Sequence, residues 1–157
     1  MKIKFIVIGK TKSDFLVSGE KKFMKRLHYY CKFEEIIISE VKNGGKLTRS
    51  ELKKKEGKLI LNSLKNNEEI ILLDNNGKIY SSKGFSKFIY QKMLTSTKSI
   101  VFIVGGAFGF SEEVYLRADH QLSLSKMTFT HQMVRLIFKE QLFRAFKIIK
   151  GEEYHNE

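Results

Sequence analysis

The chain has 157 residues, 42% of them hydrophobic, which fits one folded domain with its own core and excludes a largely disordered protein. No apolar run reaches the roughly 18 residues that cross a bilayer, and the start MKIKFIVIGKTK lacks a signal-peptide cleavage site. A single cysteine, Cys31, excludes an internal disulfide framework. We therefore expect a cytoplasmic protein that binds neither a membrane nor a structural metal.

The formal net charge of +12 is large for a domain of this size. One interpretation is a polyanionic partner, RNA or DNA. The other is that the lysines only keep soluble a chain that is rich in lysine, asparagine and isoleucine. Charge alone does not decide between these two interpretations.

Strand and helix patterns alternate from the first residues onward. Residues 2–9 are apolar and β-branched, which predicts a buried strand, and residues 13–31 place apolar side chains on one helical face. A second strand is expected at 33–41. Thr48 and Glu51 then form a capping-box pattern, which predicts the start of a lysine-rich helix.

The second half of the chain continues this alternation. A strand is predicted at 68–74, followed by a turn at 75–77 and a helix at 83–95 that buries Phe85, Phe88, Ile89 and Met93. Next come a strand at 99–106 and a helix at 111–118 capped by Ser111. The last elements are a strand at 120–126 and a helix at 130–150 closed by Gly151. The alternation predicts a single α/β domain, a mostly parallel sheet with helices on both faces. In such sheets ligands bind at the carboxyl ends of the strands.

The last predicted helix is apolar over more than one face. One apolar stripe runs from Val134 to Ile149, and a second stripe beside it contains Met133, Leu136 and Phe143. Burial on two sides explains this pattern. A homodimer interface supplies the second side in one interpretation, and a central core helix does so in the other; in a chain of this length the pattern favours the dimer.

Three predicted strand ends carry unusual residues: Leu73 with Asp74, the glycine-rich run 104–109, and the polar stretch 122–135. The glycines either let a ligand approach the backbone or make a tight turn. The run is neither a Walker A loop nor G-x-G-x-x-G, which argues against a nucleotide-dependent oxidoreductase. The chain also has no G-x-S-x-G elbow of a serine hydrolase.

Three segments carry a family resemblance that covers essentially the whole chain: MKIKFIVIGKTK, FIVGGAFGF and LSLSKMTFTHQMVRLIFKEQLFRAFKIIKGEEYH. They resemble the bacterial 23S ribosomal RNA methyltransferase H family, of the SPOUT class of S-adenosylmethionine-dependent methyltransferases. The resemblance implies one SPOUT-like domain over residues 1–157. Its C-terminal part, from about residue 70 to 157, is expected to be tied into a trefoil knot, a rare exception to unknotted connectivity.

The same resemblance implies an activity and partners. The activity is transfer of a methyl group from S-adenosylmethionine to N3 of a pseudouridine in 23S ribosomal RNA, in the large subunit or the assembled ribosome. The expected assembly is a homodimer in which the partner chain completes each site. The alternative is a non-catalytic RNA-binding protein of the same fold, which the net charge and the lack of an obvious base support.

Cofactor positions also follow from the resemblance. The implied cofactor-binding residues are Leu73, Gly105, Leu124, Ser125, Lys126, Met127, Thr128 and Phe129. The apolar side chains among them suit adenine and the methionine chain, and Gly105 lets the ligand lie against the backbone.

The acceptor N3 carries a proton, so the reaction needs a base. The candidate catalytic residues are His131, Arg135, Tyr154 and His155, with Lys126 and Arg144 as further candidates to contact phosphate. His131 and Arg135 are one helical turn apart, a spacing that would aim both at the acceptor base, whereas the plainer interpretation of His131 is a capping or packing residue. The family commonly has proline at the position of Thr130, and a threonine there can cap the helix instead.

Overall fold

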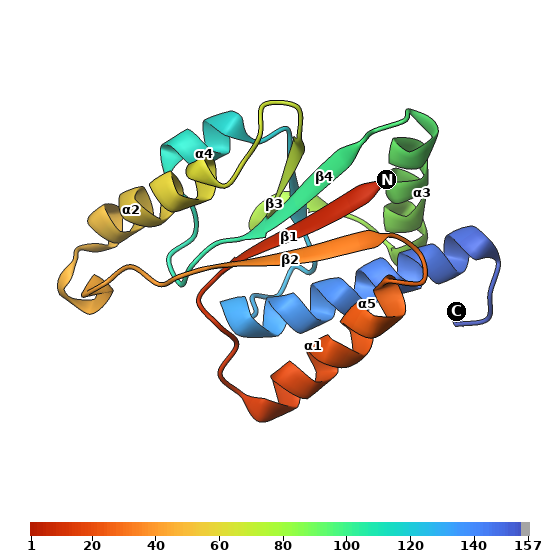
Figure 1. Ribbon diagram of the computed structural model, residues 1–157, viewed down its shortest axis with the longest axis horizontal. Coiled ribbons are helices and arrows are strands. Elements are labelled where there is room, and N and C mark those ends of the chain that lie inside the picture. The colour runs from red at the N-terminus through yellow and green to blue at the C-terminus, as the bar shows by residue number, and fades with distance from the viewer. Residues whose placement is uncertain (155–157) are drawn as a thin grey trace.

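A five-stranded parallel sheet forms the centre of the computed structural model, which describes residues 1–154. The strands are β1 (Lys2–Ile8), β2 (Lys32–Ile38), β3 (Glu69–Ile79), β4 (Ser99–Val104) and β5 (His120–Ser123). Their order across the sheet is β2-β1-β4-β3-β5 (Figure 1). The single α/β domain with a parallel sheet that the sequence predicts is therefore confirmed.

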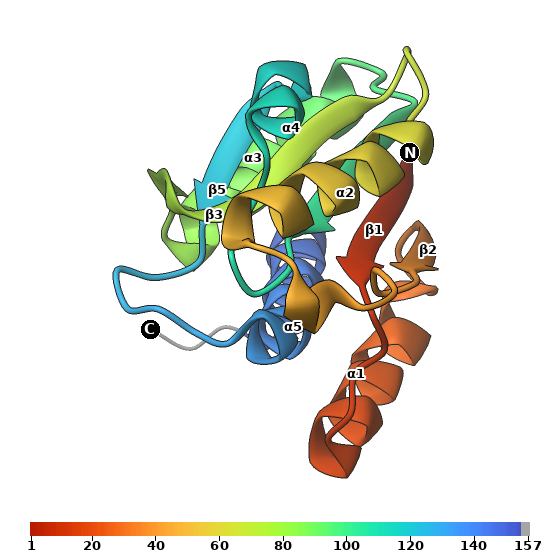
Figure 2. The same ribbon diagram turned by 90° about the vertical axis from the view of Figure 1, so that its left-hand side faces the viewer.

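Helices cover both faces of this sheet. The helices are α1 (Asp14–Leu27), α2 (Arg49–Asn62), α3 (Ser82–Leu94), α4 (Glu112–Arg117) and α5 (His131–Lys150), with a short 3-10 turn at Gly44–Lys46. Figures 1 and 2 show α1 and α5 on one face and α2 and α4 on the other. Within residues 1–154, no helix combines the length and apolar character needed to cross a membrane.

The central strands β1, β3 and β4 contribute side chains to two separate cores, because successive residues of a strand point to opposite faces. Phe5 and Phe102 pack with Phe138 of α5, and Phe85 of α3 belongs to the same core. On the opposite face, a smaller core joins alternate strand residues to α2 and α4 and contains Ile6, Ile8, Ile60, Ile70, Leu72, Val101, Ile103, Phe110 and Val114. Burial on both faces explains why the strands read as continuous apolar runs.

Most of the predicted helix ends are present. The Thr48 side chain accepts a hydrogen bond from the Glu51 amide, and the Glu51 side chain accepts one from the Thr48 amide at 2.8 Å, which completes the capping box. Gly151 ends α5 with φ of 66°. Ser111 precedes α4, but its side chain makes no capping hydrogen bond, contrary to expectation.

The turn predicted at 75–77 is wrong. The strand β3 continues to Ile79, and its pairing with β5 shifts, so that both Leu73 and Lys78 are partners of Leu122. Gly77 lies directly against β5, because a Cβ atom there would be 2.5 Å from the Leu122 amide nitrogen. A glycine in this stretch serves a close approach of two backbones rather than a reverse turn. The trefoil knot itself stays a prediction.

Two residues of the second apolar stripe of α5, Leu136 and Phe143, pack within the same chain. Leu136 packs against Gly19 of α1, where a Cβ atom would lie 2.9 Å from its methyl carbon, and Phe143 packs against Phe23 and Tyr30. These contacts account for part of the stripe, Met133 and Leu136 remain partly exposed, and the homodimer stays a prediction. Met93, expected in the core, is instead 39% exposed.

Candidate active site

Two adjoining cavities lie at the carboxyl ends of β3, β4 and β5. The larger has a volume of about 150 Å³, and the smaller, about 30 Å³, shares Leu73, Asp74, Phe129 and Val134 with it. Six of the residues expected to bind the cofactor line one or both of them: Leu73, Gly105, Leu124, Ser125, Met127 and Phe129. The fold thus gathers residues from three separate segments of the sequence at one place.

The glycine-rich run after β4 forms the floor of the larger cavity. A Cβ atom at Gly105 would lie 3.1 Å from the Gly109 carbonyl oxygen and 3.2 Å from the Phe110 ring, so a side chain there has little room. Gly109 adopts φ of 81°, a conformation that favours glycine. The run is therefore both a tight turn and a surface on which a ligand can approach the backbone.

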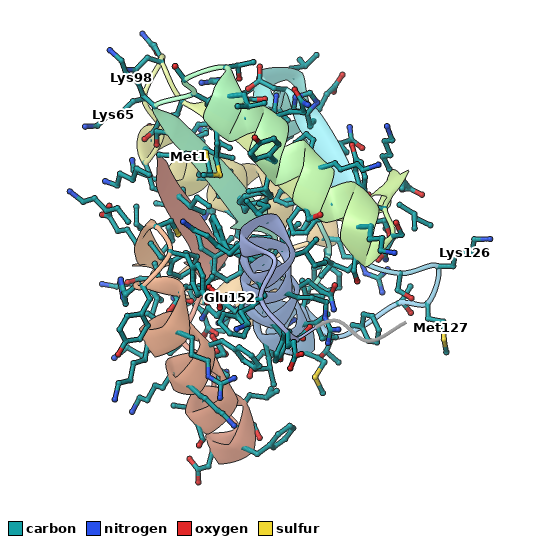
Figure 3. The ribbon with its side chains drawn as sticks, turned by 90° about the vertical axis from the view of Figure 1, so that its right-hand side faces the viewer. Met1, Lys65, Lys98, Lys126, Met127 and Glu152 are labelled. Carbon is teal, nitrogen blue, oxygen red and sulfur yellow. The ribbon has the colours of Figure 1, made fainter. Side chains whose placement is uncertain are left out.

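The loop between β5 and α5 closes the smaller cavity. Ser123 donates a hydrogen bond to the Ser125 carbonyl at 2.8 Å, and the Ser125 hydroxyl accepts one from the Met127 amide at 2.9 Å. Lys126 and Met127 extend away from the body of the protein (Figure 3), and Met127 is 75% exposed. Neither Lys126 nor Thr128 lines either cavity.

Asp74, which borders both cavities, is held in place by neighbours. Its Oδ2 accepts a hydrogen bond from the Tyr115 hydroxyl at 2.5 Å, and its Oδ1 accepts one from the Asn76 amide at 2.8 Å. Burial, reinforced by the hydrogen bond to Asp74, raises the pKa of Tyr115, so that the phenol remains a donor at neutral pH. Both carboxylate oxygens of Asp74 are therefore already engaged within the chain.

His131 lines the larger cavity at the first residue of α5. The preceding Thr130 caps this helix, since its hydroxyl accepts a hydrogen bond from the Met133 amide at 3.2 Å. Burial and then the charge of Arg135 lower the pKa of His131 below its ordinary value. The imidazole is therefore neutral at neutral pH and can accept a hydrogen bond or a proton.

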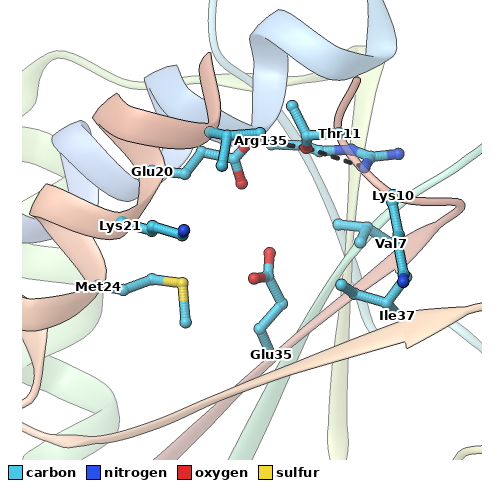
Figure 4. A pocket seen from close by; sticks show the side chains of 10 residues that line it. Val7, Lys10, Thr11, Glu20, Lys21, Met24, Glu35, Ile37 and Arg135 are labelled. Carbon is cyan, nitrogen blue, oxygen red and sulfur yellow. Dashed lines mark hydrogen bonds between the residues drawn. The ribbon is translucent and has the colours of Figure 1, made fainter. Parts of the chain in front are cut away.

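Arg135 does not reach these cavities, contrary to the expected geometry. It is 1% exposed and donates hydrogen bonds to the carbonyl oxygens of Ile8 at 2.6 Å and Gly9 at 2.8 Å. It borders a different cavity of about 340 Å³ between α1 and β2, where Figure 4 shows it beside Thr11. Because its guanidinium donates hydrogen bonds to the end of β1, Arg135 helps to position that strand, and its catalytic role stays a prediction.

Tyr154 also lies away from the cavities of its own chain. Its hydroxyl donates a hydrogen bond to Glu140 at 3.2 Å. Glu140 is nine residues beyond His131 on α5, which is about 14 Å along the helix axis. Burial and the charge of Glu140 raise its pKa. Arg144 forms an ion pair with Glu140 at 2.8 Å. His155 lies outside the described residues.

A further cavity, of about 510 Å³, adjoins the cavity of about 150 Å³ and shares Gly106, Ala107 and His131 with it. Glu56 of α2 lines it and is only 7% exposed. The sequence pattern does not single out Glu56, because a single glutamate in a lysine-rich helix is typical of a solvated face. Within residues 1–154, no group of histidine, cysteine and acidic side chains is arranged to hold a metal.

A family model described as a predicted SPOUT methyltransferase matches residues 1–155. The chain belongs to the SPOUT methyltransferase family. The enzyme class that the resemblance implied is therefore confirmed, and so is the cofactor of this class, S-adenosylmethionine.

Several curated proteins are similar to this SPOUT methyltransferase over their whole length. All three named below carry the name ribosomal RNA large subunit methyltransferase H. The protein from Christiangramia forsetii is 51% identical over 99% of both chains, and those from Flavobacterium johnsoniae and Parabacteroides distasonis are 48% and 47% identical over 100% of both. These similarities confirm the family that the sequence motifs indicated.

A more distant match is a solved methyltransferase structure from Legionella pneumophila with bound SAM. It covers 92% of this chain and 66% of that chain, at 12% identity and a TM-score of 0.44. This distant similarity adds no argument about the present chain.

Proposed function

We propose that this methyltransferase transfers a methyl group from S-adenosylmethionine to N3 of a pseudouridine in 23S ribosomal RNA, on the large subunit or the assembled ribosome in the cytoplasm. The observation that carries the proposal is the gathering of Leu73, Gly105 and the 124–129 loop around adjoining cavities at the strand ends. The relatives of nearly equal length named as large-subunit ribosomal RNA methyltransferases support the choice of substrate.

The residues present fit the proposed cofactor chemically. Leu73, Leu124 and Phe129 offer apolar walls for adenine, and the glycine run exposes backbone groups for hydrogen bonds. The two cavities are smaller than the roughly 300 Å³ of common ligand sites. We infer that the 124–130 loop, whose Met127 and Phe129 are exposed, moves outward when the cofactor binds.

The methyl donor supplies an already activated sulfonium group. The task of the protein is then to hold the acceptor nitrogen and the methyl carbon in line, and to take up the N3 proton. His131 borders the larger cavity with a neutral imidazole, and it is one candidate to take up the N3 proton.

We also propose that the active unit is a homodimer and that Tyr154 and His155 act in the site of the partner chain. Tyr154 lines neither cofactor cavity of its own chain, which leaves a role in a second chain open to it. Sedimentation at micromolar concentration tests the dimer: a species of only 18.3 kDa would contradict it.

The net charge of +12 supports an RNA partner and equally fits a non-catalytic RNA-binding protein of this fold. Calorimetry with S-adenosylhomocysteine separates these functions. The methyltransferase must bind this product, and the purely RNA-binding protein has no reason to do so. Methyl transfer to ribosomes, which should fall steeply as salt rises, completes the test.

A further inference from the structure

The cavity of about 510 Å³ has no role in cofactor binding as proposed above. Its walls come from the segment after β2, from α2, from the glycine run and from the first residues of α5. It meets the proposed cofactor cavity at Gly106, Ala107 and His131. Its volume falls in the range of about 300–1,000 Å³ that is common for small-molecule sites, and a nucleotide is a ligand of this size.

Glu56 is the most unusual side chain in this cavity. It is 7% exposed, and its carboxylate lies on the backbone of Gly106: a Cβ atom there would be 2.5 and 2.6 Å from the two oxygens. Among the described residues 1–154, no side chain or amide forms a hydrogen bond or ion pair with it. Buried carboxylates are normally partnered, so this one is available to a ligand.

The charged neighbours of Glu56 explain its electrostatic state. Glu40, after β2, lies 3.6 Å from Lys12 and is largely exposed, and His131 faces the same cavity from α5. Burial, and then the charge of Glu40, raise the pKa of Glu56. A carboxylate whose pKa is raised toward neutrality is a stronger proton acceptor than an ordinary one.

We propose that this cavity holds the acceptor nucleobase, an imide of the uracil type, and that Glu56 accepts the proton of its N3–H group. The inference rests on the proposed function. The N–H electron pair stays on N3 as the proton moves to the carboxylate, and N3 forms a bond to the methyl carbon. The carbon–sulfur bond breaks toward sulfur, and neutral S-adenosylhomocysteine leaves. Protonated Glu56 returns its proton to water.

The neighbouring polar groups suit such a base. An imide offers one N–H donor between two carbonyl acceptors, and the cavity is lined by the Glu56 carboxylate and by side chains that can donate, those of Lys12, Asn43 and Gln132. Contact between Glu56 and the ammonium group of the cofactor is the competing role. Glu56 lies in the cavity of about 510 Å³, outside the two cavities that gather the expected cofactor residues, and this position favours the nucleobase.

The test compares the full-length wild-type protein with Glu56→Gln and with Glu112→Gln, an exposed glutamate at the start of α4. Glu56→Gln keeps the shape of the side chain and removes the proton acceptor. We expect its single-turnover methylation of ribosomes to fall by about 100-fold or more, while its affinity for S-adenosylhomocysteine stays within about twofold. Glu112→Gln should match the wild type.

The pH profile separates proton transfer from pocket shape. The wild-type rate should rise with pH and level off once Glu56 is ionised, and Glu56→Gln should lack this rise. An unchanged rate, a loss with the rise retained, or a loss of more than about tenfold in S-adenosylhomocysteine affinity would each overturn the inference. A wild-type protein that binds no S-adenosylhomocysteine and methylates no ribosome would instead refute the proposed function.

Discussion

His131 and Arg135 lie one turn apart on α5, yet their side chains line different cavities. His131 borders the cavities at the ends of β3 and β4, whereas Arg135 points under the end of β1 and donates to the Ile8 carbonyl at 2.6 Å. The first turns of α5 therefore combine a residue suited to chemistry with one suited to holding the strand end. The variants below separate these two roles.

Replacement of Arg135 should mainly reduce stability. Arg135→Met leaves the Ile8 and Gly9 carbonyls without their donor in a buried place, and we expect a loss of about 3 kcal/mol in the free energy of unfolding. The matched control is Arg117→Met, since Arg117 also donates to two carbonyls but is 30% exposed and should cost less. Urea unfolding measures both. Unchanged stability with lost methyl transfer would assign Arg135 to the substrate instead.

His131 should make stability depend on pH. Burial lowers its folded-state pKa below 6.5, so the unfolded chain binds a proton more readily than the folded chain. The contribution of His131 to the free energy of unfolding is therefore complete above about pH 7 and is lost as pH falls through its folded-state pKa. His131→Gln should flatten the unfolding free energy over this interval. A titration midpoint of His131 at or above 6.5, measured by NMR, would contradict this account.

Variants of Thr130 test how the N-terminus of α5 is stabilised. Thr130→Ala removes the hydroxyl that accepts from the Met133 amide and should cost about 1 kcal/mol of unfolding free energy. Thr130→Pro loses the same cap, but the φ of −61° already matches proline, which restricts the unfolded chain. We therefore expect the proline variant to be more stable than the alanine variant in thermal unfolding. The reverse order would mean that this loop needs a backbone that proline cannot adopt.

Gly105 tests the cofactor cavity. A side chain at this position meets the Gly109 carbonyl at 3.1 Å and, if it is long, projects into the space proposed for the cofactor. Gly105→Arg should abolish binding of S-adenosylhomocysteine in calorimetry, and an unfolding curve checks that the variant remains folded. Unaltered affinity in a folded variant would show that the cofactor lies elsewhere.

The fold was largely predictable because its signals are local. Apolar runs, the Thr48–Glu51 capping box and Gly151 each act within a few residues, and all appear where expected. The segment 75–77 was not predictable, because Gly77 is explained by contact with Leu122, which is 45 positions further along the chain. Hydrophobic period alone also did not reveal that α1 packs against Leu136 and Phe143 of the second stripe of α5.

The candidate site was only partly predictable, because it also depends on contacts between segments that are distant in the sequence. Motif resemblance identified residues that line the cavities, such as Leu73 and Gly105. It did not indicate that Arg135 turns toward β1, because side-chain direction depends on which carbonyls lie nearby. It also missed Glu56, whose burial against Gly106 depends on packing between two segments that are 50 residues apart in the sequence.

The central claim is methylation of N3 of a pseudouridine. The most direct measurement is transfer of labelled methyl groups from S-adenosylmethionine to two preparations of ribosomes, one with pseudouridine and one with uridine at the modified position. We predict methylation of the first at a single nucleotide of 23S ribosomal RNA, located by mass spectrometry, and none of the second. Equal methylation of both preparations, or of neither, would contradict the account.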